Sequence, residues 1–117
     1  MSKPNNLKIY STEEVKTGEY WIDGKPVYRK IIKGSLNRTG SSVVASLSTL
    51  NYETIIKLDV VAQNTDPISS QFYSDTASNI RCYIIPSSKN LKIDVGSRYP
   101  TVPLDYVIIL EYTKTTD

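Results

Sequence analysis

The sequence contains no histidine and a single cysteine among its 117 residues. Histidine is the commonest metal ligand and the commonest general base in enzymes, so both roles lack their usual side chain. The one thiol, Cys82, can form neither an internal disulfide nor a zinc site built from thiolates. We therefore expect no metal and no cofactor.

The chain also lacks a long apolar run and a strong net charge. Lys and Arg number 14 and Asp and Glu number 12, which gives a formal net charge of +2. Because such a charge creates no long-range field, we expect no binding to nucleic acid or to an anionic membrane. No stretch is apolar enough to span a membrane, and residues 1–6 lack the apolar core of a signal peptide. We expect a soluble chain that neither inserts into a membrane nor is exported by that route.

Apolar residues do not recur at helical spacing, and alternation with a period of two takes its place. Strands are expected at residues 54–63, 79–86 and 91–95 and, more weakly, at 41–47 after a loop over 34–40. In the first strand, the side chains expected on one face are Ile56, Leu58, Val60 and Ala62. In the second, they are Ile80, Cys82 and Ile84.

This pattern predicts an all-β protein, an antiparallel β-sandwich that is jelly-roll-like, with seven or eight strands about ten residues apart. Residues 1–117 are enough for one domain with a real core. We expect flexible ends at residues 1–6 and 114–117.

The clearest local signal is Asp23-Gly24, which stands between two apolar runs at residues 20–22 and 27–32. Glycine accepts the positive φ that a tight hairpin turn requires, and aspartate suits the position before it. The sequence therefore predicts a β-hairpin here. Trp21 is expected to anchor it in the core, with a place on a binding surface as the alternative.

Little in this hairpin suggests chemistry. Lys25, Arg29 and Lys30 have no carboxylate placed to work with them, and Asp23 is used by the turn. The other acids are scattered, so a paired acid and base or nucleophile of the glycosidase kind is not evident. Cys82 lies between two isoleucines on an apolar face and is expected to be an inert core thiol. We expect no catalytic residue and no enzyme activity.

The last expected strand, residues 105–112, is apolar on both faces. Tyr106, Ile108 and Leu110 alternate with Val107 and Ile109. A strand of this kind is central in the fold or covered by another element, and a neighbouring subunit could supply that cover. We therefore place Val107 and Ile109, with Trp21, at a candidate subunit interface.

Nine tyrosines against one phenylalanine give the chain aromatic side chains with polar tips. Such residues suit adaptable recognition loops, and loops on a rigid scaffold concentrate binding groups. Two loops combine them best, at residues 68–79 and 96–101, and the candidate ligand-binding residues there are Tyr73, Arg98 and Tyr99. The alternative for the first loop is a plain long connection with one buried aromatic side chain.

Two stretches carry a family resemblance: YSTEE with WIDGKPVYRK, within residues 10–30, and YVIILEYTKTTD, at residues 106–117. The first resembles a pattern at the start of small C-terminal domains in structural and fibre proteins of tailed bacteriophages and prophages. The second is similar to the strand and tail that close those domains. Together they cover about a quarter of the chain.

The resemblance implies a fibre, tail-tip or head-attached virion protein that is made in the bacterial cytoplasm. It implies a homotrimer that contacts other virion proteins and attaches to the bacterial cell surface, with a surface glycan as the expected ligand. Two alternatives stay open. One is a purely architectural trimerisation or capping module, and the other is a carboxylate-dependent glycan hydrolase.

Overall fold

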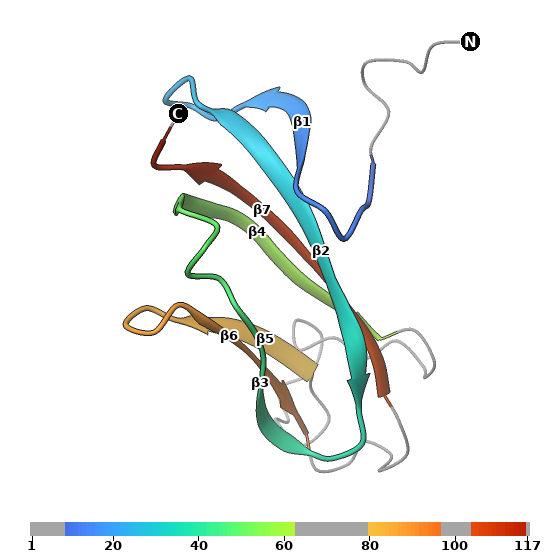
Figure 1. The fold of residues 1–117 in the computed structure, drawn as a ribbon. Helices are drawn as coiled ribbons and strands as arrows, with labels where there is room; N and C mark the ends of the chain where they lie inside the picture. Colours follow the sequence, from blue (N-terminus) through green and yellow to red (C-terminus); the bar gives the residue numbers. More distant parts are fainter. Residues whose placement is uncertain (1–8, 63–79, 97–103, 117) are drawn as a thin grey trace, which may run out of the picture.

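The computed structural model describes residues 9–62, 80–96 and 104–116. Within these ranges the chain forms seven strands and no helix, arranged as two antiparallel sheets (Figure 1). The larger sheet has the order β1 (Val15–Tyr20), β2 (Pro26–Leu36), β7 (Leu104–Lys114) and β4 (Tyr52–Ala62). The smaller sheet has the order β3 (Gly40–Ser46), β6 (Asn90–Val95) and β5 (Ile80–Ile85). The expectation of an all-β chain is confirmed.

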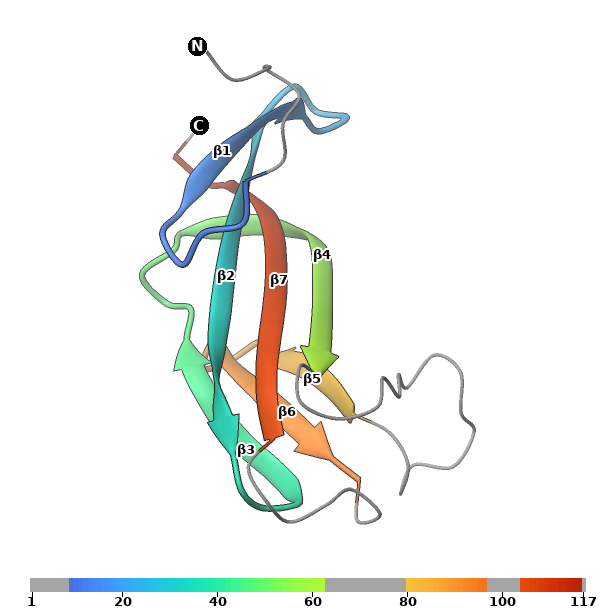
Figure 2. The same cartoon turned by 90° about the vertical axis from the view of Figure 1, so that its right-hand side faces the viewer.

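The core lies between the two sheets, which face each other with their strands at an angle (Figures 1 and 2). From β6, Leu91 and Ile93 are completely buried, and from β7 so are Ile108 and Leu110. Alternate side chains of a strand point to opposite faces, so each of these strands contributes every second residue to the core. The alternation predicted for both strands is therefore confirmed.

The inward face predicted for residues 79–86 is also confirmed in β5, which forms a hairpin with β6. Ile80, Cys82 and Ile84 all belong to the core or pack against it. The turn between the strands contains Lys89, which adopts a positive φ of 61°. Its backbone N–H donates to the carbonyl oxygen of Ile85 at 2.8 Å and closes the connection.

Two strands differ from the sequence prediction. In β4, Leu58 and Val60 face the core as expected, but Ile55 packs there in place of Ile56. The cause is a β-bulge, because Ile55 pairs with Tyr112 of β7 while Lys57 pairs with the next residue along, Glu111. A bulge adds one residue to a strand and so changes which side chains face inward.

Strand β2 continues to Leu36, through residues that were expected to begin a loop. Gly34 pairs with Tyr106 of β7, and a Cβ atom at Gly34 would lie 2.6 Å from the Tyr106 hydroxyl oxygen. The glycine therefore makes room for the tyrosine and does not end the strand. Strand β7 also extends further than predicted, because it reaches Lys114, the first residue of the tail that was expected to be flexible.

The predicted hairpin of β1 and β2 is confirmed, with Gly24 at a positive φ of 87°. The Trp21 N–H donates to the Lys25 carbonyl oxygen at 2.9 Å, and the Gly24 N–H donates to the Trp21 carbonyl oxygen at 2.9 Å. The Asp23 carboxylate accepts the Lys25 N–H at 3.0 Å. These bonds define the turn, and Asp23 has the role that the sequence assigned to it.

Replacing Gly24 with valine should destabilise the protein by about 1 kcal/mol or more, because a β-branched residue is strained at positive φ. No atom lies within 4 Å of the added Cβ, so the loss reports backbone strain alone. Asp23→Asn is the control and should be nearly neutral, since asparagine can accept the same hydrogen bond. Thermal melting of both variants measures this, and equally large losses would mean that the carboxylate charge is required.

Candidate functional site

Strand β7 is the centre of the candidate site, because both of its faces carry apolar side chains. The sequence indicated a strand that is central or covered by another element, and the structure places it centrally, between β2 and β4 in the larger sheet. Its inner residues Ile108 and Leu110 are in the core, whereas Val107 and Ile109 point to the other face and are only half-buried. The outer face of this sheet, which Figure 2 views directly, is thus apolar and partly open.

An open groove of about 370 Å³ lies on that outer face. We call it the outer groove, and the residues that define it are Tyr10, Thr12, Ile31, Lys33, Val61, Val107 and Ile109. Strand pairing brings five of them together, since Ile31 is opposite Ile109 and Val107 is opposite both Lys33 and Val61. The only charge among these seven residues is the ammonium group of Lys33. The groove can therefore hold an apolar side chain.

One wall of the outer groove is formed by the segment before β1. This segment is tied to β2 by three hydrogen bonds. The Ile31 N–H donates to the Ser11 carbonyl oxygen at 2.8 Å, and the Lys30 ammonium group donates to the Thr12 carbonyl oxygen at 2.7 Å. The Arg29 guanidinium group donates to the Ile9 carbonyl oxygen at 3.3 Å. The wall is thus held through its backbone carbonyl groups, and none of these three bonds uses the exposed Tyr10 side chain.

Arg29 supports this wall from beneath and is itself only 2% exposed. Its Nε and Nη2 atoms donate to the same Glu111 oxygen at 2.8 and 2.7 Å, and its guanidinium carbon lies 5.2 Å from the Tyr10 ring centre. Lys25 likewise pairs with Glu53 at 3.0 Å. The expectation that Arg29 and Lys25 have no carboxylate partner is therefore wrong. The partners were not evident in the sequence because both come from strands that are distant along the chain.

A second set of polar contacts, on the inner side of the larger sheet, also holds the segment before β1. The buried Tyr112 hydroxyl donates to the Glu14 carboxylate, which also pairs with the Lys114 ammonium group at 2.6 Å. Burial raises the pKa of the Tyr112 phenol, and the hydrogen bond to Glu14 raises it further. The phenol therefore stays protonated and serves as a donor. These contacts fix the start of β1 against the end of β7.

The β1–β2 hairpin ends in three consecutive large side chains, Tyr20, Trp21 and Ile22, which we call the hairpin tip. Tyr20 is 72% exposed and Ile22 is 91% exposed. Trp21 is half-buried and is not part of the core cluster, so it is not the core anchor that the sequence suggested. Exposed large apolar side chains that adjoin one another are typical of a contact surface.

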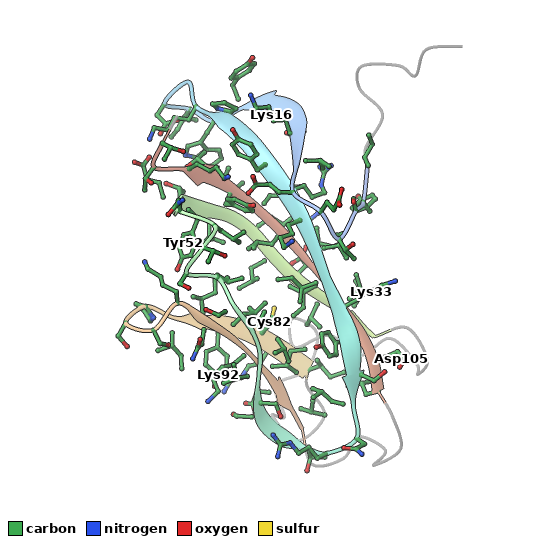
Figure 3. The ribbon with its side chains drawn as sticks, viewed as in Figure 1. Lys16, Lys33, Tyr52, Cys82, Lys92 and Asp105 are labelled. Carbon is green, nitrogen blue, oxygen red and sulfur yellow. The ribbon has the colours of Figure 1, made fainter. Side chains whose placement is uncertain are left out.

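Cys82 faces the space between the sheets (Figure 3). Burial raises the pKa of its thiol to about 11, and the nearby Asp59 carboxylate adds to this shift. Because the thiolate is the reactive form, the folded protein holds this group in its unreactive form at neutral pH. The interpretation of Cys82 as a core thiol fits this position.

Alkylation of Cys82 by iodoacetamide at pH 8 should therefore be slow in the folded protein. A rise in pKa from 9.0 to about 11 lowers the thiolate fraction about a hundredfold. The rate should rise steeply when denaturant unfolds the chain, and mass spectrometry can follow both rates. Fast labelling under native conditions would show that the thiol is exposed and ionised.

Of the candidate residues named from the sequence, Val107 and Ile109 come together in the outer groove, and Trp21 lies in the hairpin tip. Tyr73, Arg98 and Tyr99 lie outside the described residues. Sequence reasoning missed Val61 and Lys33, whose place depends on strand pairing. It also passed over Tyr20 and Ile22, although three bulky residues directly before a tight turn are a usable signal.

Among the described residues, no group of three or more Cys, Asp or Glu side chains could hold a metal ion. In the same part of the chain, no helix is long and apolar enough to cross a membrane. Comparison with protein-family models, curated proteins and solved structures gave no match. The features that point to a function are therefore the outer groove, the hairpin tip and the terminal sequence patterns.

Proposed function

We propose that this chain is a non-enzymatic structural module of a bacteriophage or prophage particle, a homotrimeric fibre or tail-tip domain that attaches to the bacterial cell surface. The proposal of a homotrimer is supported by the apolar side chains on the outer face of the central strand β7, which line an open groove. Apolar patches left on a surface mark contact sites. The proposal of attachment to the cell surface is supported by the resemblance of residues 10–30 and 106–117 to phage structural and fibre proteins.

The strand order supports a jelly-roll relationship within this proposal. The consecutive strands β2, β3, β4 and β5 alternate between the two sheets, so that β2–β7–β4 faces β3–β6–β5. A jelly roll pairs its strands in this manner through two Greek keys. The present chain would be a version shortened by two strands, with β1 added at the edge.

The mechanism would be multivalent attachment. Each copy contacts a surface glycan weakly, and several copies on one particle make later contacts intramolecular, which raises avidity without a tight single site. The partners would be the other two copies, neighbouring virion proteins and a bacterial surface glycan. The chain would act in the virion after synthesis in the bacterial cytoplasm.

Two alternatives to this function differ in what they require. A purely architectural trimerisation or capping module would need the same outer groove and hairpin tip but no ligand. A glycan hydrolase would need two carboxyl groups facing each other across a substrate site. Among the described residues, none of those lining the outer groove has a carboxyl group, which argues against hydrolysis there.

A glycan-binding screen with the protein displayed on beads in many copies tests the attachment. We expect the wild type to bind a bacterial envelope polysaccharide, and Tyr73→Ala, Arg98→Ala and Tyr99→Ala to weaken that binding. Because the sequence predicts that these residues lie on exposed loops, the substitutions should keep thermal stability within about 1 kcal/mol of wild type. If the multimerised wild type binds no bacterial glycan or cell, the architectural function replaces attachment.

A further inference from the structure

The hairpin tip and the outer groove are complementary features at different places on the molecule. The tip lies at the end of the larger sheet, beyond the start of β2 (Figure 1). The groove lies on the outer face of that sheet, where the Lys33 side chain points away from the smaller sheet (Figure 3). The structure thus has an apolar projection and an apolar recess that do not fill each other within one copy.

We propose that the hairpin tip of one copy inserts into the outer groove of a second copy of this chain. This contact rests on the proposed function, because it is the interface through which the homotrimer would form. Tip and groove are different surfaces, so the contact joins the copies head to tail. A head-to-tail contact closes into a ring when its rotation allows, and a homotrimer would contain three such contacts.

Size and polarity favour this match. The groove, at 370 Å³, falls within the range of about 300–1,000 Å³ that is typical of binding pockets. Val61 on one wall is 46% exposed and Tyr10 on the other is 55% exposed, so apolar surface remains to be covered. The tip offers the exposed aromatic side chain of Tyr20 and the exposed aliphatic side chain of Ile22. A few large anchors of this kind carry most of the energy at protein interfaces.

Opposite charges beside the tip and in the groove favour one orientation of the contact. The exposed Glu19 precedes the hairpin tip directly, and the groove contains the exposed Lys33. In the part of the chain that the structure describes, neither side chain forms an ion pair with its own copy. An acidic tip that enters a groove with a basic residue places opposite charges together, which steers the correct docking and disfavours other registers.

A charge exchange tests this pairing by light scattering coupled to size exclusion. Glu19→Lys and Lys33→Glu should each lower the average mass at concentrations where the wild type is an oligomer. The double variant, with both charges exchanged, should recover most of the lost mass. Both positions are exposed, so circular dichroism should show a folded chain in every variant. If the double variant is no better than the single variants, the pairing is wrong.

Mixing two defective chains tests the head-to-tail geometry. Ile22→Lys removes the apolar tip and keeps the groove, whereas Val61→Lys blocks the groove and keeps the tip. Each variant alone should be monomeric, and an equimolar mixture should form a heterodimer and nothing larger, because a single intact contact remains. Ile22 is 91% exposed and Val61 is 46% exposed, so neither substitution should unfold the chain, and thermal melting of each variant checks this directly.

The outcomes separate this contact from the proposed function. If Ile22→Lys and Val61→Lys each keep the wild-type oligomer mass, the copies associate through another surface. That result overturns the contact and leaves the homotrimer standing. If the two monomeric variants do not associate on mixing, the head-to-tail geometry is overturned. A wild type that stays monomeric at every concentration overturns the contact and the homotrimer together, whereas glycan binding is measured independently.

Discussion

Replacing Arg29 with methionine should lower the free energy of unfolding by about 3–5 kcal/mol, the usual cost of leaving a buried charge without its partner. The guanidinium group is 2% exposed, and its loss strands the Glu111 carboxylate, which is itself mostly buried. The same substitution removes the hydrogen bond to Ile9 and the support beneath Tyr10. Urea denaturation followed by circular dichroism measures the loss.

The matched control is the double variant Arg29→Met with Glu111→Leu. It removes both charges and fills the space with apolar side chains, so it should be clearly more stable than Arg29→Met alone. A double variant that is as unstable as the single variant would contradict this reasoning. The stability would then come from the packing of the arginine side chain and not from the ion pair.

Leu110→Ala should destabilise the fold by about 2–5 kcal/mol, because it opens a cavity in a fully buried position of β7. Ile109→Ala, one residue away on the outer face, is the control and should cost clearly less, since Ile109 is half-buried in the open groove. Both should be measured at low protein concentration, where association adds least. Equal losses would mean that the outer face is packed as tightly as the core.

Much of the fold was predictable from local patterns in the sequence. Alternation of apolar and polar residues predicted the strand β6 and the inward face of β5, and the Asp23-Gly24 pair predicted the first hairpin. Both signals act over a few residues, since a strand exposes alternate faces and a tight turn needs positive φ. The two apolar faces of β7 indicated a strand that is central or covered by another element, and the structure shows that it is central.

The errors have long-range causes. Arg29 and Glu111 are 82 residues apart in the sequence, and only the pairing of β2 with β7 brings them together. The bulge that turns Ile55 inward likewise depends on how β4 aligns with β7. Neither pairing register nor bulge position follows from the local alternation of apolar residues.

The candidate site was predicted only in part, because it also depends on contacts between segments that are distant in the sequence. Val107 and Ile109 could be assigned to an outer face, because alternation fixes which residues share a side of β7. The groove that they line also needs Val61 from β4 and Tyr10 from the segment before β1. Those two positions come from strand order and from hydrogen bonds of the backbone, which the sequence pattern does not specify.

The molar mass of the wild-type protein in solution tests the central claim, which is that the apolar outer face of β7 is an interface between copies. Light scattering coupled to size exclusion should give about three times the chain mass of 13.1 kDa. The mass should fall towards that of one chain only on strong dilution. A mass of one chain at every concentration would contradict the homotrimer and leave Val107 and Ile109 without a covering subunit.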